Sequence, residues 1–315
     1  MASGITAALR TAQSGLLANQ GALNAIANNI ANVNSPGYSR KTVKLEQRVV
    51  SGVGSGVQLS ELTRNIDEGL LKSLRLELSA LNTLSAKESY YDRMQELFGS
   101  PGDNTSISHI VQEFTATLET LAVTPEKSLE QGDVVRWGKE MTLKLQSMSD
   151  TIQDLRLQAD KAIAEDVATI NKLSTDMGNF NDLIVRNSVT KRDVTDLMDQ
   201  RDQALDKMVE IIDVRYFYRN DGDVVVFTSS GRTLVDNIPA TLTHTPASSM
   251  TPTTTHAEGD LNGLYVGTAI AGNDITNDLR GGRLQGLVQL RDSVLPNLQS
   301  QLDEFAAEIQ AALDR

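Results

Sequence analysis

Cysteine is absent from this chain of 315 residues. Disulfide bonds, thiol catalysis and cysteine-based zinc sites are therefore excluded. Aromatic residues make up only 4% of the sequence, which favours aliphatic helix packing over an aromatic-rich binding surface. The formal net charge is −12, so we do not expect a general binder of nucleic acids or anionic membranes.

The sequence also lacks an apolar run long enough to span a membrane. Its N-terminus has no cationic start, no continuous apolar stretch and no cleavage pattern, and so does not resemble a secretory signal. We therefore expect no membrane insertion, and we expect any export to use a different route.

One long stretch of the sequence is uncharged: no charged residue lies between Arg10 and Arg40. Leucine and isoleucine recur there at heptad spacing, which predicts a helix that needs a partner helix. An ordinary core helix is the alternative, but such a helix normally has a charged outer face. Here the outer face carries amides, which can pack against identical neighbours without charge repulsion. The predicted assembly interface includes Leu9, Leu16, Leu23, Ile26, Ile30, Asn28, Asn29 and Asn32.

The same stretch is expected to be weak as an isolated helix, because Gly15 and Gly21 interrupt it. We expect residues 1–35 to be loosely held in a monomer. Pro36 cannot continue the helix, Gly37 permits a turn and Tyr38 anchors the exit of the chain. These three residues complete the predicted interface.

Downstream, 3.6-residue periodicity predicts helices over 66–98, 106–121, 129–186 and 191–212. Strands are expected at 41–50, in a second strand shortly after it, and in a hairpin with an Asp-Gly turn at 221–222. A last helix is expected to begin after Gly281-Gly282. The predicted fold is mainly α with an inserted β domain: an elongated helical-bundle rod, a terminal coiled-coil segment and a small β-rich domain.

This pattern predicts four parts: an axial segment at 1–40, a helical domain with a short hairpin at 41–212, a β-rich outer domain at 213–280, and a returning helix of the helical domain at 281–315.

No stretch of the sequence carries the complete pattern of a catalytic, metal or cofactor site. Glycines at 52–56 lack the rest of a phosphate-binding fingerprint. The turn at 220–223 lacks the later glutamate of a calcium loop, and the loop 256–260 holds one histidine. A row of aspartates at 196–206 is interleaved with basic residues, which indicates a solvated, ion-paired face. We expect no enzyme, no cofactor and no metal.

The opening stretch SGLLANQGALNAIANNIANVNSPGYSRKTV (14–43) resembles the N-terminal signature of the bacterial flagellar axial proteins: the rod, hook and hook-associated family. Three later segments, at 54–77, 194–214 and 281–304, resemble the hook-associated members. The likeness covers nearly the whole chain. It implies a structural role at the hook–filament junction, outside the cell, after unfolded passage through the flagellar type III export channel.

The resemblance also implies partners: copies of the same chain in a junction ring, the hook protein, a second junction protein, and the export apparatus with its chaperone. The family places a second terminal helix at its C-terminus, which pairs with the N-terminal one and recruits the chaperone. Because this sequence stops at Arg315, we expect the chaperone site to be missing and the chain to be a monomer in solution. A hook or rod subunit, and a secreted coiled-coil adhesin or effector, are the alternatives. A hydrolase would need a pocket near 245–260.

Overall fold

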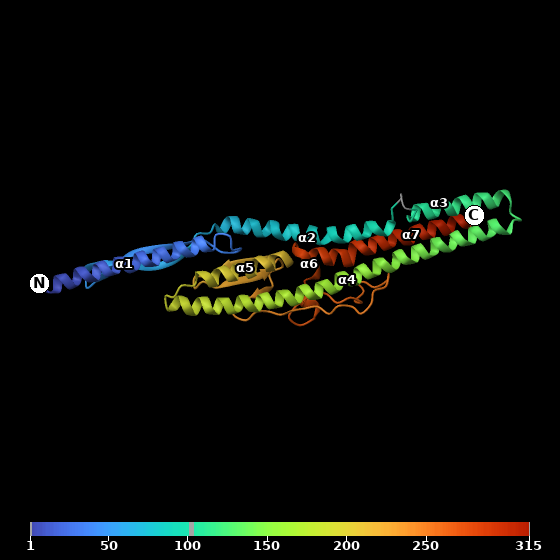
Figure 1. Cartoon of the computed structure of the whole chain (residues 1–315). Coiled ribbons are helices and arrows are strands. Elements are labelled where there is room, and N and C mark those ends of the chain that lie inside the picture. The colour runs from blue at the N-terminus through green and yellow to red at the C-terminus, as the bar shows by residue number, and fades with distance from the viewer. Residues whose placement is uncertain (1, 101–103, 315) are drawn as a thin grey trace. The chain divides into compact units, whose positions relative to one another are not determined.

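The computed structural model describes residues 2–100 and 104–314. As predicted, the fold is mainly helical with short strands (Figure 1). It divides into two compact units, each built from separate stretches of sequence. Unit 1 comprises the residues up to 77, 171–209 and 214–240, and unit 2 comprises 78–170, 210–213 and 241–314. The four-part division expected from the sequence stays a prediction.

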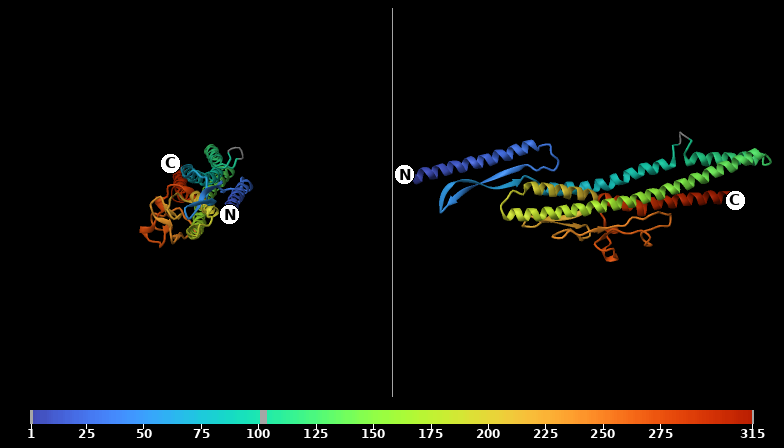
Figure 2. Two further views of the ribbon diagram at one scale, coloured as in Figure 1. Left: turned by 90° about the vertical axis from the view of Figure 1, so that its left-hand side faces the viewer. Right: turned by 60° about the horizontal axis from the view of Figure 1, so that its bottom comes forward.

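Unit 1 contains a long N-terminal helix beside a β-hairpin, three further helical segments and a small sheet (Figures 1 and 2). Its elements are α1 (Ala2–Ala31), β1 (Lys41–Val50), β2 (Val53–Arg64), the first part of α2 (Glu68–Phe98), the last part of α4 (Ser128–Val189), α5 (Thr195–Ile211), β3 (Val214–Tyr218), β4 (Val224–Thr228) and β5 (Thr233–Val235).

The β1–β2 and β3–β4 hairpins of unit 1 turn at residues with positive φ. Ser51 and Gly52, with φ of 53° and 81°, connect the antiparallel strands β1 and β2. Two such residues in succession are typical of the tight turn that matches strand twist. Between β3 and β4, Gly222 has φ of 93° and its N–H donates to the Arg219 carbonyl. The predicted Asp-Gly hairpin is therefore confirmed.

Unit 2 is built from helices with a long irregular connection between them. It contains the rest of α2, α3 (Ile107–Val123), the first part of α4, α6 (Gly282–Gln289), a π-helical turn η4 (Leu290–Val294) and α7 (Leu295–Leu313). The connection carries β6 (Leu242–Thr243), β7 (Tyr265–Val266), η2 (Ala271–Asn273) and η3 (Thr276–Asp278). The segment 213–280 was predicted to be β-rich. Most of its strand residues lie within 214–235, since β6 and β7 have only two residues each.

Helix α4 buries the apolar stripe that its periodicity predicted. In the part of α4 that belongs to unit 2, Met148, Ile152, Leu155 and Ile170 are at most 3% exposed. Met177, in the part that belongs to unit 1, is also fully buried. Ser106 caps α3, because its Oγ accepts from the His109 N–H at 3.2 Å. The helix expected after Gly281 is interrupted by η4, where the backbone contains a wider turn.

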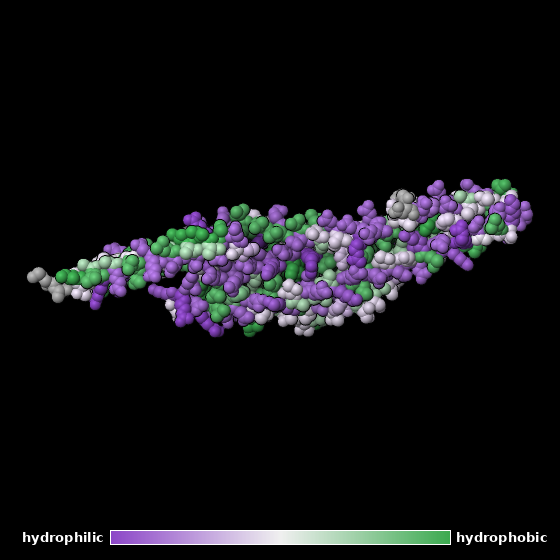
Figure 3. Space-filling view, viewed as in Figure 1, coloured by the Kyte–Doolittle hydropathy of each residue, from purple (hydrophilic) through white to green (hydrophobic). Residues whose placement is uncertain are grey.

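Helix α2 is oriented differently from what its leucine stripe suggests. Its buried face is largely polar and includes Arg75, Ser79 and Thr83, whereas Leu81 and Leu84 are more than half exposed. Figure 3 shows hydrophobic side chains gathered over this helix. Among the described helices, none combines the length and apolar character needed to cross a membrane.

Candidate assembly interface

The apolar residues predicted for assembly share one open face of α1. The α1 seam consists of Leu9, Leu16, Leu23, Ile26 and Ile30, and each of these side chains is between 53% and 70% exposed. Large apolar side chains left open in a row at heptad spacing are the usual sign of a surface that pairs with another helix.

The opposite face of α1 is covered by the β-hairpin. Ser14, Ala18 and Ala25 are buried there, and the Val57 N–H donates to Ser14 Oγ at 3.1 Å. A Cβ atom at Gly21 would lie 2.8 Å from Leu59 Cδ1, closer than carbon atoms pack. Small residues therefore let the hairpin approach the helix, and this packing directs the seam away from the hairpin.

Asn29 ties the end of α1 to the start of β1. Its Nδ2 donates to the Lys41 carbonyl at 2.8 Å, and its Oδ1 accepts from the Lys41 N–H at 2.9 Å and from the Tyr38 hydroxyl at 3.0 Å. The amide thus pairs with a strand backbone as a neighbouring strand would. Asn29 therefore bonds within its own chain, and its predicted role in contacts with neighbouring subunits stays a prediction.

Asn32 also bonds within its own turn, where Nδ2 donates to the Asn28 carbonyl at 3.0 Å and Oδ1 accepts from Ser35 Oγ at 3.2 Å. Asn28 is exposed. A role of Asn28 in contacts between subunits stays a prediction, as does the assembly role of the α1 seam.

The Pro-Gly-Tyr motif forms a tight turn. The Tyr38 N–H donates to the Ser35 carbonyl at 3.2 Å, with Pro36 and Gly37 between them. Gly37 has φ of 75°, and proline followed by a positive-φ glycine is the signature of a type II turn. A Cβ at Gly37 would lie 2.3 Å from Gln203 Cγ of α5. This turn therefore requires glycine for its backbone and for the close approach of α5.

The chain leaving this turn is held by carboxylates of α5. Ser39 donates to Asp199 through both its N–H and its hydroxyl. Lys41 forms an ion pair with Asp196, and Arg64 Nη1 lies 3.1 Å from Asp199 and 2.7 Å from Asp202. We call Ser39, Lys41, Arg64, Asp196, Asp199 and Asp202 the α5 anchor. It fixes both ends of the β1–β2 hairpin to one helix.

The interpretation of the aspartate row as a solvated face is wrong for its central members. Asp199, Asp202 and the neighbouring Arg201 are all less than 9% exposed. Arg201 turns inward and donates to the Gly222 carbonyl at 2.5 Å. The cations that pair with the aspartates come from residues 41–75, far away in sequence, so a helix-local pattern of charges could not reveal them.

Two further groups extend the anchor towards α2 and β3. Arg75 Nε donates to Asp206 at 2.6 Å and its Nη1 donates to the Tyr216 hydroxyl at 2.7 Å. Burial lowers the pKa of Arg75, but Asp206 and Tyr216 outweigh it and the pKa is raised. Burial and the Asp202 carboxylate raise the pKa of Tyr218 to about 12. At neutral pH Arg75 is therefore charged and Tyr218 is a neutral phenol.

The three stretches that carry incomplete phosphate, calcium or metal patterns are turns and loops of the fold. Gly52 lies in a hairpin turn, and 220–223 connects β3 to β4. His256 Nδ1 lies 2.9 Å from the Leu261 carbonyl within its own loop. In the described part of the chain, no group of three or more His, Asp or Glu side chains is placed to hold a metal ion.

Comparison with known families agrees with this architecture. The family described as "Flagellar hook-associated protein FlgK helical domain" matches residues 91–315. The chain belongs to this FlgK family. A second family, "Flagella basal body rod protein", matches residues 9–38, which include the α1 seam and the Pro-Gly-Tyr turn. Because the FlgK match covers the helical body, a hook or rod subunit is the less supported alternative.

The curated relatives are called flagellar hook-associated protein 1. The chain is 29% identical to that of Salmonella typhimurium, covering 94% of this chain and 53% of the relative. It is 26% identical to that of Escherichia coli K12, covering 97% and 56%. The chain therefore spans about half the length of these relatives.

A solved structure has a similar fold. The flagellar hook junction protein FlgK from Burkholderia pseudomallei matches with a TM-score of 0.60 at 20% identity, covering 75% of this chain and 41% of that one. The sequence-based assignment to the hook-associated proteins is thus confirmed.

Proposed function

We propose that the chain is a structural, non-enzymatic subunit of the bacterial flagellum that connects hook to filament at their junction, outside the cell. The membership in the FlgK family over residues 91–315 supports this role, and so do the junction-related names of its relatives. We further propose that subunits reach the junction through the flagellar type III export route.

The observation that carries the assembly proposal is the open α1 seam. The hairpin covers the small-residue face of α1, while Leu16 and Leu23 remain 70% and 65% exposed. No charged residue lies between Arg10 and Arg40, so identical helices can pack side by side without charge repulsion. Copies of the chain would bury these seams together, with residues 1–40 acting as the axial segment.

The proposed partners follow from this position. Besides further copies of the chain, they are the hook protein on one side and the second junction protein on the other, with the export apparatus and its chaperone acting earlier. The α5 anchor would connect the axial segment mechanically to the rest of unit 1, since it holds both ends of the hairpin that leads out of α1.

A double substitution, Leu16→Asp with Leu23→Asp, tests the seam. Both side chains are exposed, so the variant should fold, be exported and yet fail to enter the junction, giving hooks without filaments. Leu143→Asp is a matched control, because Leu143 is similarly exposed on α4 and outside the seam. Normal filaments with the double variant would contradict the proposal. Immunogold labelling of flagella would check the location independently.

A further inference from the structure

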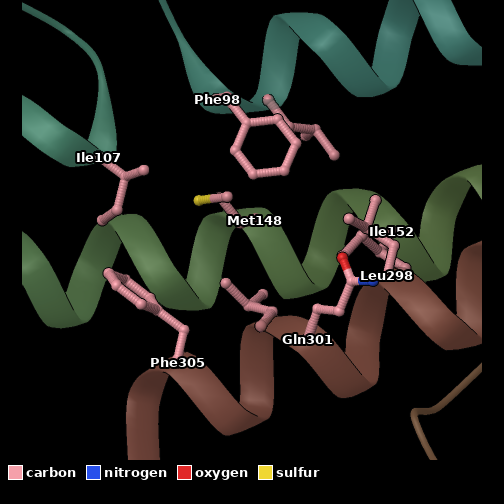
Figure 4. A pocket seen from close by; sticks show the side chains of 9 residues that line it. Phe98, Ile107, Met148, Ile152, Leu298, Gln301 and Phe305 are labelled. Carbon is pink, nitrogen blue, oxygen red and sulfur yellow. The ribbon is translucent and has the colours of Figure 1, made fainter. Parts of the chain in front are cut away.

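Two pockets of the molecule differ in how specifically they could recognise an occupant. In unit 2 a cavity of about 250 Å³ is lined by side chains such as Phe98, Met148 and Phe305, all apolar apart from Gln301 (Figure 4). Polar groups are what make a pocket specific, so this cavity indicates no particular occupant. In unit 1 a surface pocket of about 430 Å³ lies between α1 and the β1–β2 hairpin, and charged side chains line it.

The pocket of unit 1 brings two arginines together. Arg10 lines it from α1 and Arg48 from β1, and Gln13 and Gln58 line it as well. Both arginines are exposed. Within residues 2–100 and 104–314, neither guanidinium group has an ion pair or a hydrogen bond. Two guanidinium groups with amides beside them form a donor set that suits a carboxylate. We call Arg10, Gln13, Arg48 and Gln58 the arginine pocket.

A β-bulge sets the position of Arg48. The pairing of β1 with β2 shifts between Gln47 and Val49, so Arg48 lies opposite a bulge in β2. Gly56 belongs to this bulge, with φ of 97°, and a Cβ atom there would collide with Ser14 Oγ of α1. A bulge interrupts the regular alternation of side chains and redirects them. The close approach of the hairpin to α1 and the bulge together account for an arginine of β1 at this pocket.

The bulge also separates Arg48 from the carboxylate that is nearest to it along β1. Glu46 lies two residues earlier, where a regular strand would place both side chains on one face, yet the two form no ion pair. Residues 1–64, which comprise α1 and the hairpin, contain one other carboxylate, Glu61. It lies opposite Lys44 in the strand register, and such cross-strand pairs of opposite charge are favourable. Within the described residues, Glu46 has no cationic partner.

An isolated chain therefore holds two like charges side by side and leaves one carboxylate of the same hairpin alone. Two arginines that line one pocket repel each other unless an anion lies between them. Glu46 of the same chain does not reach the pocket, but a neighbouring copy carries an identical Glu46. If each copy offers its carboxylate to the next, every pocket and every carboxylate is satisfied, which is the pattern of a head-to-tail contact.

We propose that the arginine pocket of one copy binds the Glu46 carboxylate of a second copy, with Arg10 and Arg48 as the two cations. The proposal rests on the junction role proposed above, because packing of α1 seams brings residues 1–64 of two copies side by side. The contact repeats from copy to copy, as a ring requires. The apolar seam supplies affinity, and the ion pairs fix the height at which neighbouring copies meet.

Exchange of the two charges tests the contact in a flagellated strain in which each variant replaces the unchanged chain. Arg48→Glu and Glu46→Arg should each give at least about tenfold fewer filaments per hook, because like charges then meet. The double variant should restore filaments, as counted by electron microscopy. Normal filaments with Arg48→Glu, or a double variant no better than the single ones, would overturn the proposal. Loss with Arg48→Glu but not with Glu46→Arg would assign the pocket to a different polypeptide and overturn the second copy as occupant.

A matched control shows whether any reversed charge disturbs assembly. Lys161→Glu changes an exposed lysine of α4 in unit 2 and should leave filaments normal. Immunoblots of the medium should contain the single variants, because exported subunits that cannot enter the junction are released.

Disulfide trapping gives a second measurement, because the chain has no cysteine of its own. Gln13→Cys with Glu46→Cys in one chain should give dimers and a ladder of larger species when isolated flagella are oxidised, since the seam still holds the copies together. Asn24→Cys with Glu46→Cys should stay monomeric, because Asn24 lies about 16 Å further along α1. No ladder from the first pair, or equal ladders from both, would refute the contact.

The seam variant separates this inference from the junction role. If Leu16→Asp with Leu23→Asp prevents filaments whereas Arg48→Glu does not, the arginine pocket is refuted and the junction role stands. If both variants give normal filaments, the proposed junction role fails together with the pocket.

Discussion

Asn29 and Lys41 are joined by two hydrogen bonds, one in each direction. The Asn29 amide donates to the Lys41 carbonyl at 2.8 Å and accepts from the Lys41 N–H at 2.9 Å. A single side chain therefore replaces a strand neighbour at the first residue of β1. The same residue pair sets where the chain leaves α1 and where the hairpin begins.

Replacing Asn29 by alanine should loosen this connection. The change removes three hydrogen bonds, one of them from Tyr38. It leaves the backbone N–H and the backbone carbonyl of Lys41, a buried residue, without these partners. We expect a loss of about 2 kcal/mol in unfolding free energy and faster hydrogen exchange of the β1 amides. Asn34→Ala is the control, because Asn34 is exposed and should change stability by less than about 0.5 kcal/mol. Equal effects of the two substitutions would contradict the assigned role.

Gly37→Ala should destabilise the turn for two separable reasons. Its φ of 75° costs a residue with a side chain about 1–2 kcal/mol, and the new Cβ would collide with Gln203. The double variant with Gln203→Ala should recover only the collision part. Urea unfolding followed by circular dichroism measures both.

The control for this substitution lies inside α1. Nothing lies within 4 Å of a Cβ built at Gly15, so Gly15→Ala should stabilise the protein by about 0.5–1 kcal/mol through helix propensity. If Gly37→Ala were also neutral or stabilising, the turn could not depend on glycine as argued.

The sequence predicted those features that depend on local periodicity or turn chemistry. The heptad of α1 and the stripe of α4 could be recognised because each repeats within one helix. The hairpin turn at Asp221-Gly222 follows from the backbone preferences of single residues.

The buried polar residues could not be predicted from the sequence, because their partners are distant in the chain. The leucines of α2 give the segment its helical periodicity, yet the buried face of the helix carries Arg75, which bonds to Asp206, and Thr83, which donates to the Gly282 carbonyl. Asp199 was assigned to a solvated row for the same reason. A polar residue is buried where a distant segment satisfies it, and a single sequence without an alignment does not show which segment that is.

Tyr218 should make the free energy of unfolding depend on pH in the alkaline range. Its pKa in the folded protein is about 12 and its ordinary value is 10.0, so the folded state holds the proton more tightly. This stabilisation is fully present below pH 10 and is lost as pH rises from about 10 through about 12, by roughly 2 to 3 kcal/mol at most. Tyr218→Phe should remove this part of the pH dependence, which urea unfolding at pH 9 to 12 measures. Tyr91→Phe, at an exposed position, should retain it, and identical curves for Tyr218→Phe and the unchanged protein would contradict the cause given.

In unit 2, Asp160 should produce the opposite dependence, at acid pH. Its carboxylate accepts from Arg291 Nη1 at 2.6 Å, from the Ala247 N–H at 2.7 Å and from His244 Nε2 at 3.1 Å, and so holds the loop after β6 against α4. Burial alone would raise its pKa, but the bonds from His244, Ala247 and Arg291 outweigh burial and lower the pKa below the ordinary 3.8.

Because the folded pKa of Asp160 is depressed, its contribution is complete above pH 4 and is lost as the pH falls further. Asp160→Asn should lower the unfolding free energy at pH 7 by about 3 kcal/mol, since Arg291 stays buried with one carboxylate fewer. The variant should also lose less stability than the unchanged protein between pH 4 and pH 2. Asp150→Asn, at an exposed position of α4, should change neither quantity. An acid dependence that is the same with aspartate or asparagine at position 160 would mean that the loop is held by its apolar contacts, not by this carboxylate.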